Sequence, residues 1–128
     1  KFCWVTIHVK DMEKSLNFYE NILNLQIARR FKPDENTEIV FLGNGETQIE
    51  LIWNKDEALN INNCQNNFSM GFVVETIEKI TDVLNREGIK IHSGPFQPNP
   101  SIKFIYILDP DGMKIQLVQN IRHITLGD

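Results

Sequence analysis

The stretch FIYILDPDGMKIQLVQ at positions 104–119 predicts two β-strands joined by a tight turn. In the turn, Pro110 presets its own φ, the aspartate side chains can accept hydrogen bonds from nearby backbone, and Gly112 tolerates a positive φ. The runs on either side are rich in β-branched and apolar residues, as strands are. Gln116 is a polar residue in the middle of the second strand, so the face it occupies bears on function.

This pattern occurs twice in the chain. FLGNGETQIELIW at 41–53 aligns with ILDPDGMKIQLVQ at 107–119, at an offset of 66 residues. Upstream, WVTIHVKDMEK at 4–14 aligns with SMGFVVETIEK at 69–79, at an offset of 65 residues. Two copies are too few for a solenoid, so the repeat predicts one domain made of paired modules.

Each half predicts the element order β-α-β-β-β. The first has strands at 2–9, 25–31, 38–42 and 46–53, and a helix capped by Asp11 that runs to about Leu23. The second has strands at 68–74, 89–92 and in the final hairpin, a helix between Thr76 and Gly88, and a proline-rich loop at 93–101 whose Phe96 is either a pocket rim or part of an ordinary connector. The whole chain thus reads as a single domain with module one at about 2–53, a connector at 54–67, module two at about 68–119 and a tail at 120–128.

One helix can cover only one face of a four-stranded sheet, so the other face of each module needs a partner. The other module is the obvious candidate. We therefore predict an α+β fold in which two tandem βαβββ modules form an open half-barrel sheet with the helices outside.

Composition excludes several classes of function. A net charge of −4 and a pI near 5.4 argue against a nucleic-acid partner, and Arg29-Arg30 is interpreted as a solvated strand end. Apolar runs fall far short of the ~20 residues that a membrane-spanning helix needs. Cys3 and Cys64 have no metal-ligand spacing and are interpreted as reduced packing cysteines, which favours a cytoplasmic location.

Polar residues share one face of two predicted strands. Strand alternation puts Trp4, Thr6 and His8 on the face opposite Val5, Ile7 and Val9, and puts Gln48 beside Glu50. A desolvated carboxylate at position 50 would suit a general base for proton abstraction next to a carbonyl. A carboxylate held by hydrogen bonds for structure is the alternative, and both stay open here.

The string VKDMEKSLNFYENILNL, the paired βαβββ units, IELI after a glycine turn and DPDGMKIQLV together resemble the vicinal oxygen chelate superfamily over about residues 2–119. Its members include glyoxalase I, extradiol dioxygenases, fosfomycin-resistance enzymes and bleomycin-binding proteins. The resemblance implies a divalent metal held by side chains from the first and last strand of each module. On this sequence those positions are Trp4, Glu50, Ser69 and Gln116.

Only one of these four positions carries a strong metal ligand, Glu50. The indole of Trp4 is a donor only, and Ser69 and Gln116 supply weak neutral oxygens. His8 shares the strand face of Trp4, so it either completes a two-ligand metal site with Glu50 or lines the pocket and hydrogen-bonds a substrate or Glu50. The cofactor expectation is therefore none, or a weakly held divalent ion.

Three functions follow from these residues. The first is a small-molecule-binding member of the family whose pocket is lined by Trp4, Thr6, His8, Gln48, Ser69 and Gln116. In it, Trp4 either forms an apolar wall for a flat ligand or only fills the space that a metal would occupy. The second is a glyoxalase-type lyase or isomerase with Glu50 as base, and the third is a structural or interaction module. We expect a homodimer and no membrane or nucleic-acid partner.

Overall fold

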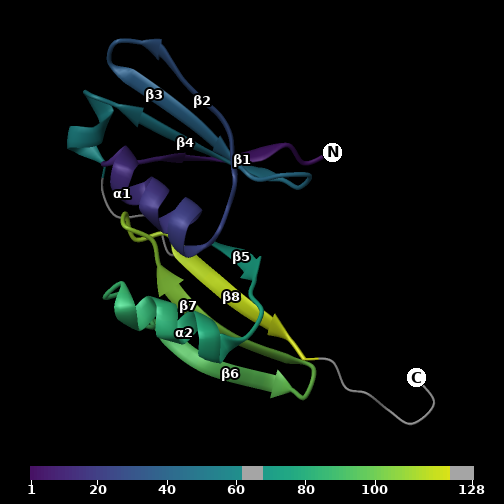
Figure 1. The fold of residues 1–128 in the computed structure, drawn as a ribbon. Helices are drawn as coiled ribbons and strands as arrows, with labels where there is room; N and C mark the ends of the chain where they lie inside the picture. The colour runs from purple at the N-terminus through teal and green to yellow at the C-terminus, as the bar shows by residue number, and fades with distance from the viewer. Residues whose placement is uncertain (62–67, 122–128) are drawn as a thin grey trace. The chain divides into compact units, whose positions relative to one another are not determined.

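The computed structural model describes residues 1–61 and 68–121. Cys64, interpreted from the sequence as a reduced packing cysteine, lies outside the described residues. The chain divides into two compact units, residues 1–64 and 65–128. Each unit holds an open four-stranded sheet with a helix on one face (Figure 1). The fold is therefore α+β with two βαβββ repeats, as the sequence predicts.

The first unit orders its strands β1-β4-β3-β2, so that β1 and β4 are parallel and the other pairs antiparallel. Its elements are β1 (Trp4–His8), α1 (Met12–Leu16), a π-helical segment (Asn17–Ile22), β2 (Ile27–Asp34), β3 (Thr37–Leu42), β4 (Gln48–Asn54) and a 3₁₀ turn (Glu57–Asn60).

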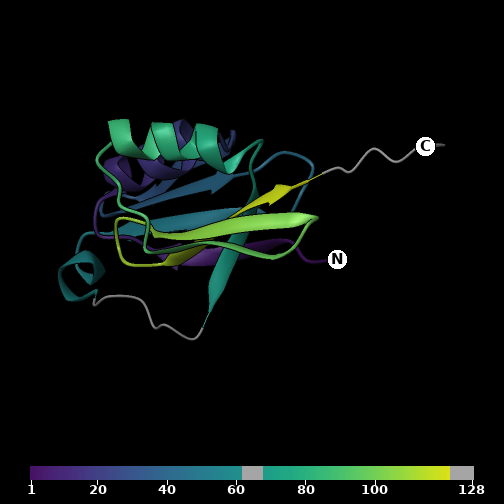
Figure 2. The ribbon, with the colours of Figure 1, turned by 90° about the horizontal axis from the view of Figure 1, so that it is seen from below.

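The second unit repeats this topology with the order β5-β8-β7-β6, and α2 packs on β7 and β8 (Figures 1 and 2). Its elements are β5 (Ser69–Val73), α2 (Ile77–Arg86), β6 (Ser93–Asn99), β7 (Ile102–Leu108) and β8 (Lys114–Asn120).

The first helix begins where the sequence predicts but changes geometry midway. The Asp11 side chain accepts a hydrogen bond from the Lys14 backbone N–H at 3.0 Å, which caps the helix. After Leu16 the turns widen, and the Leu23 N–H donates to the Phe18 carbonyl five residues back at 3.0 Å. No sequence signal predicted this π-helical segment, although the helical stretch still ends near Leu23 as expected.

The core of each unit lies between its helix and one face of its sheet. Alternate strand residues supply the sheet side of that core and helical residues supply the rest, as binary patterning requires. On this face of the first sheet the buried strand residues are Ile7, Val40, Leu42, Ile49 and Leu51, with Val9 directly after β1, and on the second they are Ile105, Ile107, Ile115 and Leu117.

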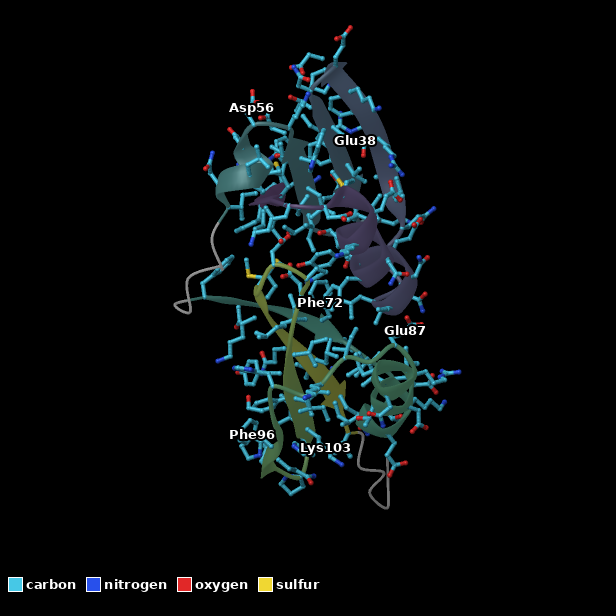
Figure 3. The ribbon with its side chains drawn as sticks, turned by 90° about the vertical axis from the view of Figure 1, so that its left-hand side faces the viewer. Glu38, Asp56, Phe72, Glu87, Phe96 and Lys103 are labelled. Carbon is cyan, nitrogen blue, oxygen red and sulfur yellow. The ribbon has the colours of Figure 1, made fainter. Side chains whose placement is uncertain are left out.

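Arg30 joins the first helix to the sheet by ion pairs. Its guanidinium lies 2.8 Å from the Glu13 carboxylate on α1 and 3.2 Å from the Glu38 carboxylate on β3. Figure 3 labels Glu38 on this strand. Hydrogen bonds to Glu13 and Glu38 raise the pKa of Arg30 above its ordinary value. Both arginines are exposed, as the sequence predicts, but neither ends the strand, because β2 continues to Asp34. Arg30 is also paired with two carboxylates, which the sequence did not predict.

Two strand predictions in the second unit are wrong. The proline-rich segment expected as a loop is the edge strand β6, while no strand forms at 89–92. An edge strand can contain prolines because its outer N–H groups need no partner, and the register of β6 is interrupted on both sides of Phe96. The edge strand β2 likewise contains Pro33.

The predicted turn at 109–112 is confirmed in its details. One oxygen of the buried Asp109 carboxylate accepts hydrogen bonds from the backbone N–H groups of Asp111 and Met113, each at 2.8 Å. Gly112 has a φ of +88°, a conformation that residues with a side chain rarely adopt. The turn therefore fixes how β7 leads into β8.

We expect Asp109→Ala to lower the free energy of unfolding by about 3 kcal/mol, because two buried N–H groups would lose their acceptor. Asp109→Asn keeps the acceptor oxygen and should lose much less. Asp34 makes a similar but exposed bond to the Asn36 N–H at 2.8 Å, so Asp34→Ala is the matched control, with a cost of about 0.5 kcal/mol. Urea denaturation measures all three, and equal losses for Asp109→Ala and Asp34→Ala would contradict the buried-acceptor account.

Candidate functional site

The face of the first sheet opposite α1 carries a row of four side chains, one from each strand. Thr6 pairs with Glu50, Glu50 with Phe41, and Phe41 with Arg29 in the strand register. Residues at one level on neighbouring strands point to the same face, about 5 Å apart. A hydroxyl, a carboxylate, an aromatic ring and a guanidinium therefore lie side by side across this face.

Glu50 is fixed by Thr6. The Thr6 hydroxyl donates a hydrogen bond of 2.6 Å to Oε1 of Glu50, and Glu50 is only partly exposed. Hydrogen bonds to an ionised acceptor are short and strong, so this contact holds the carboxylate in one orientation. No hydrogen bond or ion pair joins the second oxygen, Oε2, to the residues that the structure describes.

Trp4 lies on the same face of the sheet, two residues before Thr6. Trp4 is 47% exposed, and its ring meets the ring of Phe41 edge-on with 5.2 Å between centroids. A cavity of about 620 Å³ opens at this end of β1, lined by Lys1, Phe2, Cys3, Trp4, Gly45, Glu46, Thr47 and Gln48. Gln48 lies in its wall, with its amide donating to the Gly43 carbonyl at 3.3 Å.

His8 lies at the other end of β1 and pairs with a residue that the sequence analysis missed. Its Nδ1 is 3.2 Å from the Glu57 carboxylate in the 3₁₀ turn after β4. A second cavity of about 490 Å³ is lined by His8, Asp56, Glu57, Asn60 and Ile61. Because β4 runs parallel to β1, the residues that follow β4 lie at the His8 end of β1. The parallel pairing of these two strands was the one signal that could have predicted a contact between His8 and Glu57.

The second unit has the same backbone frame but different side chains. Gln116 pairs with Gly71 and Tyr106, so Gly71 occupies the position of Thr6 and offers no hydroxyl. Ser69 lies on the same exposed face of β5 as Gly71. The predicted site residues therefore lie on two different sheets. Those on the first are Trp4, Thr6, His8, Gln48 and Glu50, and those on the second are Ser69 and Gln116.

An aromatic cluster covers the outer part of this second face. The Phe96 ring, on the edge strand β6 (Figure 3), lies 5.4 Å from the Phe104 ring and 6.4 Å from the Tyr106 ring. The ammonium group of Lys114 lies 4.3 Å from the centroid of the Tyr106 ring. Phe96 is thus part of a sheet face, whereas the sequence analysis expected it on a loop.

A family model, the Glyoxalase/Bleomycin resistance protein/Dioxygenase superfamily, matches residues 1–117. The chain belongs to this superfamily. A lactoylglutathione lyase of Neisseria meningitidis is 28% identical, covering 88% of this chain and 86% of its own. A probable lactoylglutathione lyase of Synechocystis is 31% identical, covering 88% and 90%. The trypanothione-dependent glyoxalase I of Leishmania major shares the fold, with a TM-score of 0.78, 22% identity and coverage of 93% and 86%.

At the four positions that the resemblance to the superfamily implies for a metal, Trp4, Glu50, Ser69 and Gln116, the side chains do not fit a divalent ion. Trp4 has no acceptor atom, Ser69 and Gln116 are neutral, and Glu50 already accepts the Thr6 hydroxyl with one oxygen. Within residues 1–61 and 68–121, no three His, Cys, Asp or Glu side chains group in a way that could hold a metal ion.

In the same part of the chain, no helix is both long and apolar enough to cross a membrane.

The bond between Thr6 and Glu50 should appear as a coupling in a double-mutant cycle. We expect Thr6→Val to lower the free energy of unfolding by about 1 kcal/mol in the natural chain and by much less in a Glu50→Ala background. Thr47→Val is the control, because the Thr47 hydroxyl donates to the Phe2 carbonyl and should show the same loss in both backgrounds. Additive losses for Thr6→Val and Glu50→Ala would show that the contact contributes nothing.

Proposed function

We propose that this chain binds a small organic molecule on the open face of its first sheet, without a fully ligated divalent metal. The observation that carries the proposal is the carboxylate of Glu50, oriented by Thr6 and flanked by the half-exposed ring of Trp4. Binding sites for small molecules combine a large apolar surface with a few fixed polar groups, and this face has both.

Trp4 supports the proposal by its exposure. Trp4 is 47% exposed and lines a cavity, so it offers apolar surface to a ligand. Its contact with Phe41 keeps the ring upright on the sheet, so a flat ligand could pack on it without reorganising the protein. Ser69 and Gln116 are proposed as further ligand-binding residues on the second sheet.

Tryptophan fluorescence can test which ring meets the ligand, since Trp4 and Trp53 are the only two tryptophans. Trp53 has the strand parity of Leu51, on the opposite face of β4. In a screen of flat aromatic and thiol-conjugate compounds, we expect Trp53→Phe to keep ligand-induced quenching and Trp4→Phe to lose it. The ligand concentration that gives half of the maximal thermal stabilisation should rise at least about tenfold in Trp4→Ala. Compounds that stabilise Trp4→Ala and the natural chain equally would contradict the proposal.

The alternative is a lyase or isomerase of glyoxalase type, which the names of the Neisseria and Synechocystis relatives favour. Glu50 would act as the base, taking a proton on Oε2 while Thr6 holds Oε1. A weakly bound metal would then rest on Glu50 and His8. The pairing of His8 with Glu57 weighs against that ligand pair, because it directs the Nδ1 edge of the imidazole to the 3₁₀ turn.

Metal analysis separates the two functions. We expect the purified protein to hold well below one equivalent of nickel, zinc, iron or manganese, and to turn over lactoylglutathione at the background rate with or without these ions. His8→Ala should leave the metal content unchanged. One tightly held ion per chain, lost in Glu50→Gln and accompanied by turnover, would establish the lyase and overturn the binding proposal.

The proposal also includes a homodimer, because a two-fold dimer is the commonest closed assembly of identical chains.

A further inference from the structure

Arg29 and Arg30 are neighbours on β2 but lie on opposite faces of the sheet. Arg30 lies on the α1 face and is neutralised by two carboxylates. Arg29 lies on the open face, and it has no carboxylate partner among the residues that the structure describes, whose ion pairs involve His8, Arg30 and Lys79. The open face of the first sheet therefore carries an unneutralised cation.

The guanidinium of Arg29 is held in place by aromatic rings. It lies 4.2 Å from the centroid of the Phe41 ring and 5.9 Å from that of the Phe31 ring, while Phe31 and Phe41 are stacked at 6.5 Å. Phe41 is only 3% exposed, whereas Arg29 is exposed and Phe31 is 42% exposed. Phe41 thus supports the guanidinium from below, which reduces the conformational freedom that binding would otherwise remove.

The N–H groups of a stacked guanidinium stay available at its edge. They form a planar fork that matches the two oxygens of a carboxylate, and a bidentate pair of this kind fixes both position and orientation. A lysine or a mobile arginine would attract an anion without orienting it. Arg29 therefore has the geometry of a group that recognises an oxyanion.

The row across the sheet sets where that oxyanion would lie. Arg29 and Glu50 are two strands apart with Phe41 between them, or roughly 10 Å between backbones. We propose that the ligand of this face is a flat organic carboxylate, with its oxyanion on Arg29 and its apolar body against Trp4 and Phe31. This inference rests on the proposed binding function and adds the chemical class of the ligand.

The second sheet lacks this arrangement, which makes the inference specific to the first. Its equivalent row is Gly71, Gln116, Tyr106 and Ser93, so a serine stands where the first sheet has Arg29. Lys114 does lie over Tyr106, but it enters from β8 at another level of the sheet. Lys114 therefore provides an independent comparison in the test.

The test compares 2-naphthoate with 2-naphthamide, which have nearly the same shape but differ in charge. Dissociation constants come from NMR chemical-shift titrations of the full chain. We expect naphthoate to bind about tenfold more tightly than naphthamide, since a hydrogen bond to a charged group is worth about that factor. Arg29→Gln should abolish this preference by weakening naphthoate binding far more than naphthamide binding, and Arg29→Lys should keep only part of the preference.

Two control variants complete the test. Lys32→Gln makes a similar charge change on the same strand with α1-face parity, and it should keep the preference for naphthoate. If both compounds bind equally in the natural chain, or if Lys114→Gln abolishes the preference and Arg29→Gln does not, the assignment of Arg29 is wrong while the binding function stands. If neither compound binds and the wider ligand screen also finds nothing, the binding function itself fails.

Discussion

The parallel pairing of the first and last strand of each repeat is the constraint on which the rest of this structure depends. It brings together Thr6 and Glu50, which are 44 residues apart in the chain, and the hydrogen bond between them is 2.6 Å long. Side chains alternate with a period of two along a strand, so a slip of one residue would turn Glu50 into the apolar layer under α1. The register therefore decides that the carboxylate lies on the open face.

The two repeats show how one backbone plan can carry two different chemistries. The offsets of 65 and 66 residues put Gly71 in the place of Thr6, and Gln116 in the place of Glu50, with the strand pairing preserved. In the first sheet the central position is an oriented carboxylate, and in the second it is a neutral amide beside a glycine. Membership of the superfamily fixes the frame, while the side chains on it determine the function.

The charged residues of β2 illustrate how position on a sheet sets the role of a side chain. Arg30 stabilises the fold by holding α1 against β3, and Arg29 leaves its charge on the face where Glu50 and Trp4 lie. Aromatic rings accompany the cation on each open face, with Phe41 under Arg29 and Tyr106 under Lys114. Such stacking holds a charged group at an exposed surface without a compensating carboxylate.

The sequence by itself determined the repeat, the α+β class, the helix caps at Asp11 and Thr76, and the turn at Asp109, because each depends on local periodicity or on residues within one turn of each other. Strand alternation also gave the shared face of Trp4, Thr6 and His8. Tertiary structure decided what the alternation could not: that β6 forms at a sheet edge despite its prolines, that His8 meets Glu57, and that Arg29 stacks on Phe41. Alternation tells which face a side chain takes but not its neighbour on the next strand. The register of β1 with β4 and of β2 with β3 sets which residues stand opposite one another.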